Sequence, residues 1–252
     1  TAAALLDGAY SVTAVATDAS GNESAASAAQ SFTIDTVAPE VPQITSGVLT
    51  NDATPVITGT AQVGATVSVT VAGKTYTVTA SDGTWSVDTG AASGTGTSTF
   101  TANGSNAVSV TATDAAGNES AAATQTLVVD TTLPTVAITD NQEGTANGQI
   151  IYTFTFSETV SGFTVDDVTV GNGTKGLFTQ VSASVYQLEV TPDAGEAGNV
   201  TVDVAGAVAV DGTGNNSSAA TQSVQVFDTL APNALEINAV AIDDVVDAIE
   251  NR

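Results

Sequence analysis

The sequence predicts an all-β fold, a tandem series of antiparallel β-sandwiches arranged end to end. One segment, Asp-x-x-Gly-Asn-x-Ser, occurs three times, starting at Asp18, Asp114 and Asp211, so that its starts are 96 and 97 residues apart. Short runs in which apolar residues alternate with threonine lie between these segments, and glycine-containing turns separate the runs. A repeat of this length, filled with short strands and turns, is typical of sandwich domains rather than of βαβ units.

The predicted strands follow from alternation with a period of two residues, which a sheet buried on one face requires. The clearest alternating runs are residues 10–17, 66–71, 74–78, 108–112, 152–156 and 199–204. Turns are predicted at residues 72–73, 81–83, 103–104, 147–148, 172–173 and 211–212. Only residues 242–249 carry a pattern that is compatible with a helix.

Three linkers with the pattern Asp-Thr-x-x-Pro start at Asp35, Asp130 and Asp228. Because proline restricts its own backbone and that of the residue before it, we expect short, stiff linkers that bring the loops of neighbouring units into contact. The predicted divisions are the C-terminal part of one unit (residues 1–35), two complete units (residues 36–130 and 131–228) and the N-terminal part of a further unit (residues 229–252).

Two aromatic residues have predicted structural roles. Tyr10 follows Asp7-Gly8-Ala9 just ahead of a strand, as in the tyrosine corner of a sandwich, where the ring hydroxyl hydrogen-bonds back across a turn. Trp85 follows a turn and lies on the same strand face as Val87, so we expect it in the core rather than on a sugar-stacking surface.

The composition excludes several classes of partner and site. Twenty-seven acidic residues stand against three basic ones, with no histidine, for a net charge of −24. Such a chain is expected to repel nucleic acid and anionic membranes, and no apolar run is long enough for membrane insertion. Cysteine is absent, which excludes disulfides and thiolate metal sites. A bound metal ion is then the expected way to stabilise the domains in place of a disulfide.

Oxygen-bearing side chains recur in step with the linkers, which favours a hard cation. Calcium accepts six to eight oxygen ligands in irregular geometry, whereas zinc prefers the histidine or cysteine that this chain lacks. Whether a loop such as 18–22 meets the aspartate that closes its own last strand depends on the course of residues 23–30. The alternative interpretation is an ordinary turn, because Asp, Gly, Asn and Ser are common turn formers.

Two longer stretches resemble a known family. Residues 44–71 and 83–87, with the closing loop at Asp114, resemble the bacterial immunoglobulin-like (Ig-like) repeats of giant secreted adhesins of the biofilm-associated and repeats-in-toxin types. Residues 152–163 and 166–170 resemble a sister class of these repeats. The resemblance implies tandem Ig-like sandwiches at the bacterial surface, stiffened by calcium (Ca²⁺) at the joints, which contact neighbouring repeats while other parts of the protein bind the receptor.

The resemblance also implies metal ligands at three joints, the fourth member of each set coming from the next unit. These sets are Asp18, Asn22, Asp35 and Asp52; Asp114, Asn118, Asp130 and Asp140; and Asp211, Asn215, Asp228 and Asp243. Catalysis is not expected, because the adjacent pair Asp166 and Asp167 points to opposite faces of a strand. The alternative function is a calcium-dependent carbohydrate-binding module.

Overall fold

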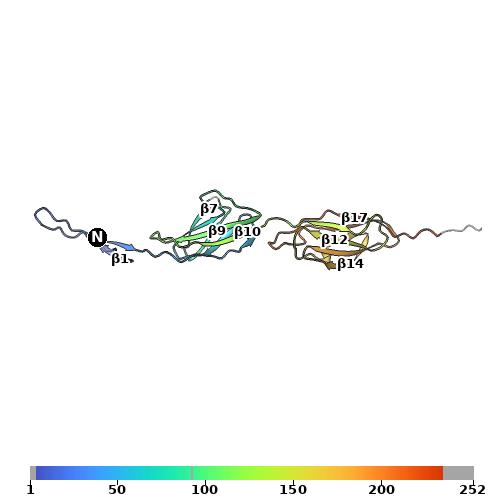
Figure 1. The fold of residues 1–252 in the computed structure, drawn as a ribbon, viewed down its shortest axis with the longest axis horizontal. Helices are drawn as coiled ribbons and strands as arrows, with labels where there is room; N and C mark the ends of the chain where they lie inside the picture. Colours follow the sequence, from blue (N-terminus) through green and yellow to red (C-terminus); the bar gives the residue numbers. More distant parts are fainter. Residues whose placement is uncertain (1–3, 92, 235–252) are drawn as a thin grey trace, which may run out of the picture. The chain divides into compact units, whose positions relative to one another are not determined.

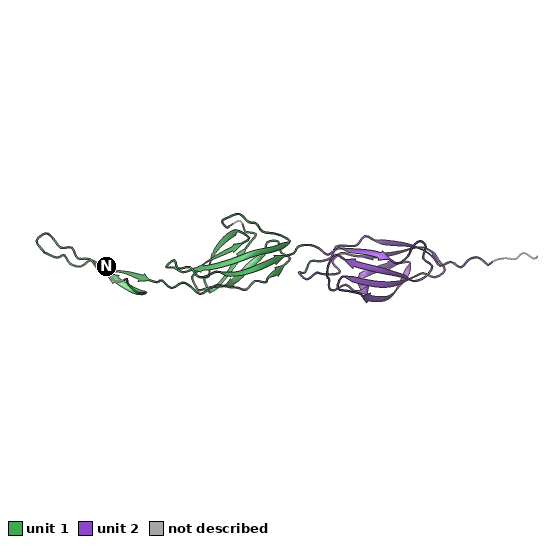
Figure 2. Ribbon diagram, viewed as in Figure 1, with its two compact units in different colours: residues 1–132, 213–215 green, residues 133–212, 216–252 purple. Residues whose placement is uncertain are grey.

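The computed structural model describes residues 4–91 and 93–234, so the predicted helix at residues 242–249 and Asp243 lie outside the described part (Figure 1). The described residues form β-strands and one short 3-10 helix, which confirms the all-β prediction. Two compact units are present: residues 1–132 with 213–215, and residues 133–212 with 216–252 (Figure 2). None of the described helices is long and apolar enough to cross a membrane.

The first unit begins with a hairpin of β1 (Gly8–Val12) and β2 (Gln30–Ile34). The Tyr10 hydroxyl donates a hydrogen bond to the Leu6 carbonyl oxygen at 2.8 Å, as the predicted tyrosine corner requires. The ring stacks on Phe32 at 5.7 Å between centroids. The strand ends at Val12, earlier than the alternating run predicted.

The sandwich of the first unit consists of a five-stranded sheet, ordered β4-β10-β9-β6-β7, and a three-stranded sheet, ordered β3-β5-β8. The bounds are β3 (Gln43–Ile44), β4 (Leu49–Thr50), β5 (Val56–Thr60), β6 (Thr66–Val71), β7 (Lys74–Thr79), β8 (Thr84–Asp88), β9 (Gly104–Thr113) and β10 (Ala123–Val129). Alternate residues of these strands face the core, as in Val67 and Val69 of β6. Trp85 is only 3% exposed and belongs to this core, as predicted.

Gly59 is required by that core. A β-carbon at this position would lie 2.2 Å from an atom of the Trp85 indole ring and 2.0 Å from the Gln43 carbonyl oxygen. Only a residue without a side chain lets β5 pass this close to the indole and to β3.

The second unit also forms a sandwich. Its four-stranded sheet is ordered β11-β12-β15-β14 and its three-stranded sheet β13-β16-β17. The bounds are β11 (Val136–Asp140), β12 (Ile150–Phe156), η1 (Val165–Asp167), β13 (Val168–Gly171), β14 (Gly173–Gln180), β15 (Val185–Pro192), β16 (Ala197–Val204) and β17 (Ser223–Asp228). Asp166 and Asp167 lie in the 3-10 helix η1 rather than in a strand.

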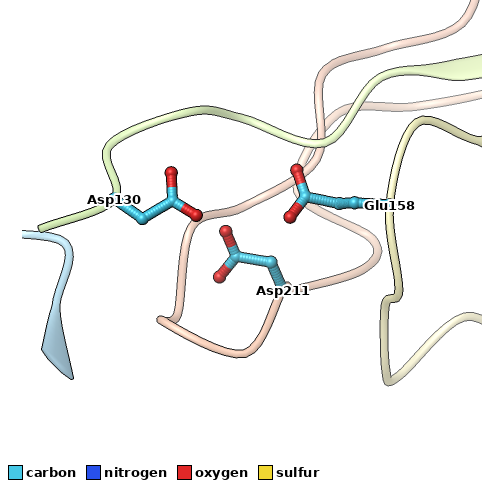
Figure 3. A group of neighbouring side chains, drawn as sticks. All are labelled: Asp130, Glu158 and Asp211. Atoms are coloured by element: carbon cyan, nitrogen blue, oxygen red, sulfur yellow. The ribbon is translucent and has the colours of Figure 1, made fainter. Parts of the chain in front are cut away.

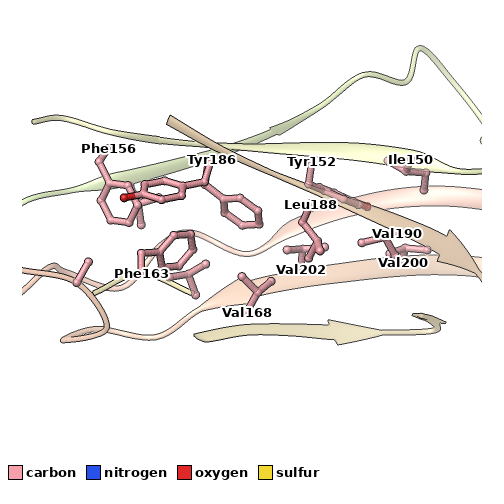
Figure 4. Packing of buried hydrophobic residues seen from close by; sticks show 14 of the residues in the cluster. Ile150, Tyr152, Phe156, Phe163, Val168, Tyr186, Leu188, Val190, Val200 and Val202 are labelled. Atoms are coloured by element: carbon pink, nitrogen blue, oxygen red, sulfur yellow. The ribbon is translucent and has the colours of Figure 1, made fainter. Parts of the chain in front are cut away.

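The core of the second unit includes a group of aromatic rings around Phe163 (Figure 4). The Phe163 ring makes edge-on contacts with Phe156 and Tyr186, both at 5.1 Å between centroids, and with Phe154 at 5.5 Å. Such aromatic pairs add stability beyond the burial of apolar area. This packing holds the end of β12, and the loop that follows it, in a fixed place.

Candidate metal centre

The recurring Asp-x-x-Gly-Asn segment folds as a loop in which the aspartate caps backbone amides. Asp114 Oδ1 accepts hydrogen bonds from the backbone amides of Ala116 at 2.8 Å and Asn118 at 2.9 Å, and its Oδ2 accepts one from Asn118 Nδ2 at 2.9 Å. Gly117 has φ +95, the left-handed conformation that glycine adopts without strain. The hydrogen bond from the Asn118 side chain is the main cause that lowers the pKa of Asp114.

The first copy of the segment has the same geometry. Asp18 accepts hydrogen bonds from the backbone amides of Ser20 and Asn22 and from the Asn22 side chain, each at 2.9 Å. The Asn22 side chain is again the main cause of a lowered pKa of the aspartate. The ordinary-turn interpretation is therefore right about how the loop itself is built.

The asparagines of the second and third loops also reach the aspartate that ends the preceding repeat. Asn118 Nδ2 donates to the carbonyl oxygen of Asp35 at 3.1 Å, and Asn215 Nδ2 donates to the carbonyl oxygen of Asp130 at 2.8 Å. The predicted sets grouped Asn118 with Asp130 and Asn215 with Asp228, and that grouping is wrong.

The antiparallel pairing of the last two strands explains the difference. β10 runs back along β9, with Ala123 opposite Val110 and Val129 opposite Gly104. Seven residues of strand cover about 23 Å, so the loop at one end of this pair cannot meet the aspartate at the other. In the first hairpin, the amide of Ser24 donates to the Ala16 carbonyl oxygen and that of Ser27 to the Ala14 carbonyl oxygen, so residues 23–30 run back along the chain instead of looping toward Asp35.

The two predicted fourth ligands in the described residues, Asp52 and Asp140, do not lie where the sets placed them. Asp52 lies two residues after the end of β4 and accepts a hydrogen bond from the Thr54 amide. The last residue of β4, Thr50, accepts a hydrogen bond from the Asp130 amide through its carbonyl oxygen at 2.9 Å. Asp52 therefore lies near Asp130, at the opposite end of its sandwich from Asp35. Asp140 ends β11 and is paired with Tyr152 in β12.

Asp228 ends β17, and its amide donates to the Ala146 carbonyl oxygen. Its side chain accepts a hydrogen bond from the amide of Leu230 at 3.0 Å. It therefore caps the start of the next linker rather than joining the loop at Asp211.

Three carboxylates converge at one place in the described residues. Asp130, Glu158 and Asp211 each offer an oxygen atom, and these three atoms all lie within 4.8 Å of one another (Figure 3). Asp211 is 7% exposed, and the other two side chains are half-buried. At an effective dielectric constant of about 20, each pair of negative charges at this separation repels by roughly 3 kcal/mol, so the cluster favours a counter-ion.

Each member of this carboxylate cluster is held by a defined element. Asp130 follows β10, Glu158 lies two residues beyond the end of β12, and Asp211 opens the third recurring loop. Backbone hydrogen bonds of 2.8 and 3.0 Å between Ser161 and Val210 join the two loops that carry Glu158 and Asp211. The positions of these two carboxylates are thus set by backbone pairing.

Glu158 is the functional candidate that the sequence interpretation missed. It lies two residues after the predicted strand at residues 152–156, and this place at a strand end was the sequence feature that could have marked it as a possible ligand. Strand register shows which residue of the first sandwich corresponds to Glu158. Thr66 pairs with Thr113, just before Asp114, as Ser161 pairs with Val210, just before Asp211, so Glu158 corresponds to the exposed Val63. The first sandwich therefore has an apolar side chain where the second has a carboxylate.

The donor atoms of the cluster suit calcium. All three are carboxylate oxygens, the ligand type that hard divalent cations prefer, and the chain has neither histidine nor cysteine to favour zinc.

Comparison with known proteins identifies the domains. Residues 44–131 and residues 130–227 each match the model of a bacterial Ig-like domain family. The second range starts at Asp130 and also contains Glu158 and Asp211. No curated protein matches the chain.

Among solved structures, the chain is similar to the FN1-FN3 domains of chicken CNTN1, with 12% identity and a TM-score of 0.32, over 86% of this chain and 77% of that one. It is also similar to chitinase ChiA74 from Bacillus thuringiensis (11% identity, TM-score 0.27, 75% of this chain and 28% of that one). The endo-fucoidan hydrolase MfFcnA4 matches with 15% identity and a TM-score of 0.22, over 90% of this chain and 34% of the hydrolase.

The chain thus spans about a third or less of the two hydrolases, and none of these structural similarities carries an argument about activity. Bacterial Ig-like domains are typically non-enzymatic and usually extracellular or surface-exposed. With two successive matches and two β-sandwiches, the chain carries two bacterial Ig-like domains in tandem.

Proposed function

We propose that this chain is a structural extender, or spacer, in a large bacterial cell-surface adhesin, and that calcium at its linkers stiffens it in support of adhesion or biofilm formation. The observation that carries this proposal is the cluster of Asp130, Glu158 and Asp211. The tandem Ig-like domains and the net charge of −24 also support it, because both suit a soluble, extended surface region. Binding of a receptor is assigned to other parts of the parent protein.

In this proposal, Asp130, Glu158 and Asp211 hold the ion through their carboxylate oxygens. Calcium supplies two positive charges that offset the mutual repulsion of the three carboxylates. Asn215 acts beside them as a positioning residue, since its side-chain amide holds the Asp130 carbonyl oxygen. Binding therefore ties the linker that starts at Asp130 to the loops that carry the other two carboxylates.

The expected energies suit an extracellular role. A site with a dissociation constant of about 0.1 to 1 mM gains roughly 1.4 to 2.7 kcal/mol of stability in about 10 mM calcium. At submicromolar cytosolic calcium the gain is close to zero. The linker that starts at Asp130 would then be flexible in the cytosol and would be stiffened by calcium after export.

Calcium titration of the whole chain by isothermal calorimetry tests the site. We expect one calcium ion per chain at Asp130, Glu158 and Asp211, and loss of that binding in Glu158→Gln. The matched control is Glu189→Gln, which removes the same charge from β15, where Glu189 accepts a hydrogen bond from Gln149. Equal binding by both variants would contradict the assignment.

Scattering and proteolysis test the stiffening separately. With calcium, we expect slower cleavage within residues 130–134 and a narrower distribution of molecular dimensions in small-angle X-ray scattering than with a chelator. Unchanged values in both measurements would reject the spacer mechanism while leaving the binding result intact.

The alternative carbohydrate-binding function lacks a supporting observation. The single tryptophan of the chain is 3% exposed, so it offers no ring face for a sugar to stack on.

A further inference from the structure

The chain contains three Asn-Gly pairs, at Asn103, Asn147 and Asn172. This dipeptide is chemically labile, because glycine places no side chain in the way when its backbone nitrogen approaches the asparagine side chain. Reaction requires the asparagine side-chain carbonyl carbon to rotate toward that nitrogen. The folded environment of each pair therefore decides whether it reacts.

Asn103 is restrained. Its Oδ1 accepts hydrogen bonds from both the amide and the hydroxyl of Thr131, at 2.7 and 2.8 Å. The corresponding contact in the first hairpin is made by Asp7, whose carboxylate accepts a hydrogen bond from Thr36 at 2.8 Å. This side chain fixes the residue after Asp130 and is not free to rotate.

Asn172 is also restrained. It adopts φ 58, and its side-chain amide donates to the Asn199 carbonyl oxygen at 2.8 Å. Its own carbonyl oxygen accepts from the Asp193 amide, and Gly173 already belongs to β14. Both the side chain and the backbone of this pair are held.

Asn147 lies in a different environment. Asn147 and Gly148 are both exposed, and a β-carbon at Gly148 would meet nothing within 4 Å. Ala146 is anchored, since its amide donates to the Val226 carbonyl oxygen and its carbonyl oxygen accepts from the Asp228 amide. Ile150 begins β12, so the labile pair lies in a short exposed segment between two fixed points.

We propose that Asn147 is a site of spontaneous covalent modification, namely deamidation through a cyclic imide, while the fold protects the other two pairs. The backbone nitrogen of Gly148 attacks Cγ of Asn147, a new C–N bond forms, and the side-chain nitrogen leaves as ammonia. Water then adds to either carbonyl of the ring and opens it, leaving aspartate or isoaspartate. No oxidant or reductant takes part.

The modification changes the charge next to a linker. Each event converts a neutral amide to a carboxylate, one residue from the Ala146 carbonyl oxygen that accepts the Asp228 amide. The isoaspartate product also inserts an additional backbone carbon between the anchor at Ala146 and the start of β12.

Incubation of the whole chain in H₂¹⁸O at mildly alkaline pH, followed by peptide mapping with mass spectrometry, tests the proposal. We expect Asn147 to react at least about tenfold faster than Asn103 or Asn172, because each protected side chain must first give up its hydrogen bonds. Each converted residue should carry one ¹⁸O atom. Equal rates at the three pairs in the folded chain would overturn the proposal.

Two controls separate the fold from the sequence. In denaturant the three pairs should react at similar rates, and a persistent preference for Asn147 would show that its reactivity is not set by the fold. Gly148→Ala should slow the reaction strongly without unfolding the chain, because the position is open and its φ lies outside the left-handed region. An unchanged rate in that variant would reject attack by the residue 148 nitrogen.

Discussion

Replacement of Glu158 by glutamine should have opposite effects on stability with and without calcium. The carboxylate lies within 4.8 Å of two others, so the substitution removes two repulsive pairs but keeps the shape of the side chain. Each pair is worth roughly 3 kcal/mol at an effective dielectric constant of about 20, and solvent screening of the half-buried groups reduces the sum to about 1 to 2 kcal/mol. Without calcium, Glu158→Gln should therefore be more stable than the parent chain.

Calcium should reverse this order, because the variant loses one of three anionic ligands and with it most of the roughly 1.4 to 2.7 kcal/mol that binding contributes. The assay is thermal unfolding in chelator and in about 10 mM calcium, where 1 kcal/mol shifts the midpoint by about 4–8 °C for a domain of this size. Glu189→Gln is the control and should keep the calcium response. A lower melting temperature of Glu158→Gln in chelator would refute the reasoning from repulsion, and an undiminished calcium response would refute the ligand role.

Three further predictions concern the first sandwich. Val63→Glu places a carboxylate at the position that corresponds to Glu158, and we expect a second calcium ion per chain in equilibrium dialysis; an unchanged stoichiometry would refute the correspondence. Gly59→Ala drives a β-carbon into the Trp85 ring, so urea unfolding followed by tryptophan fluorescence should show a loss of about 3 kcal/mol or more, and a loss below 1 kcal/mol would contradict the packing. The folded state lowers the pKa of Asp114 below its unfolded value of 3.8. The ionised carboxylate therefore stabilises the folded chain above pH 3.8, and this stabilisation is lost as pH falls through the folded pKa. Asn118→Ala should weaken that acid dependence, and an identical pH profile would count against the hydrogen bond as its cause.

Several features could be predicted from the sequence because they depend on local pattern. Alternation in runs such as 66–71 and 152–156 specified strands, since one face of each sheet is buried against the other. The core position of Trp85 followed from its phase relative to Val87, and the hydrogen bond of Tyr10 followed from the turn ahead of it. The recurring loop could also be predicted, because the aspartate accepts hydrogen bonds from the asparagine four residues later and the glycine between them allows the turn.

The grouping of the carboxylates was decided only by the tertiary structure. Asp130 is 28 residues from Glu158 and 81 from Asp211 along the chain, and spacing gives no sign that they meet. Antiparallel pairing of the last two strands of each domain carries the loop and the closing aspartate to opposite ends, while the packing of Phe163 and the pairing of Ser161 with Val210 bring Glu158 to Asp211. Composition and repeat length thus determined that the chain is an acidic tandem of β-sandwiches, whereas strand direction and long-range backbone pairing determined which of its negative charges share one place.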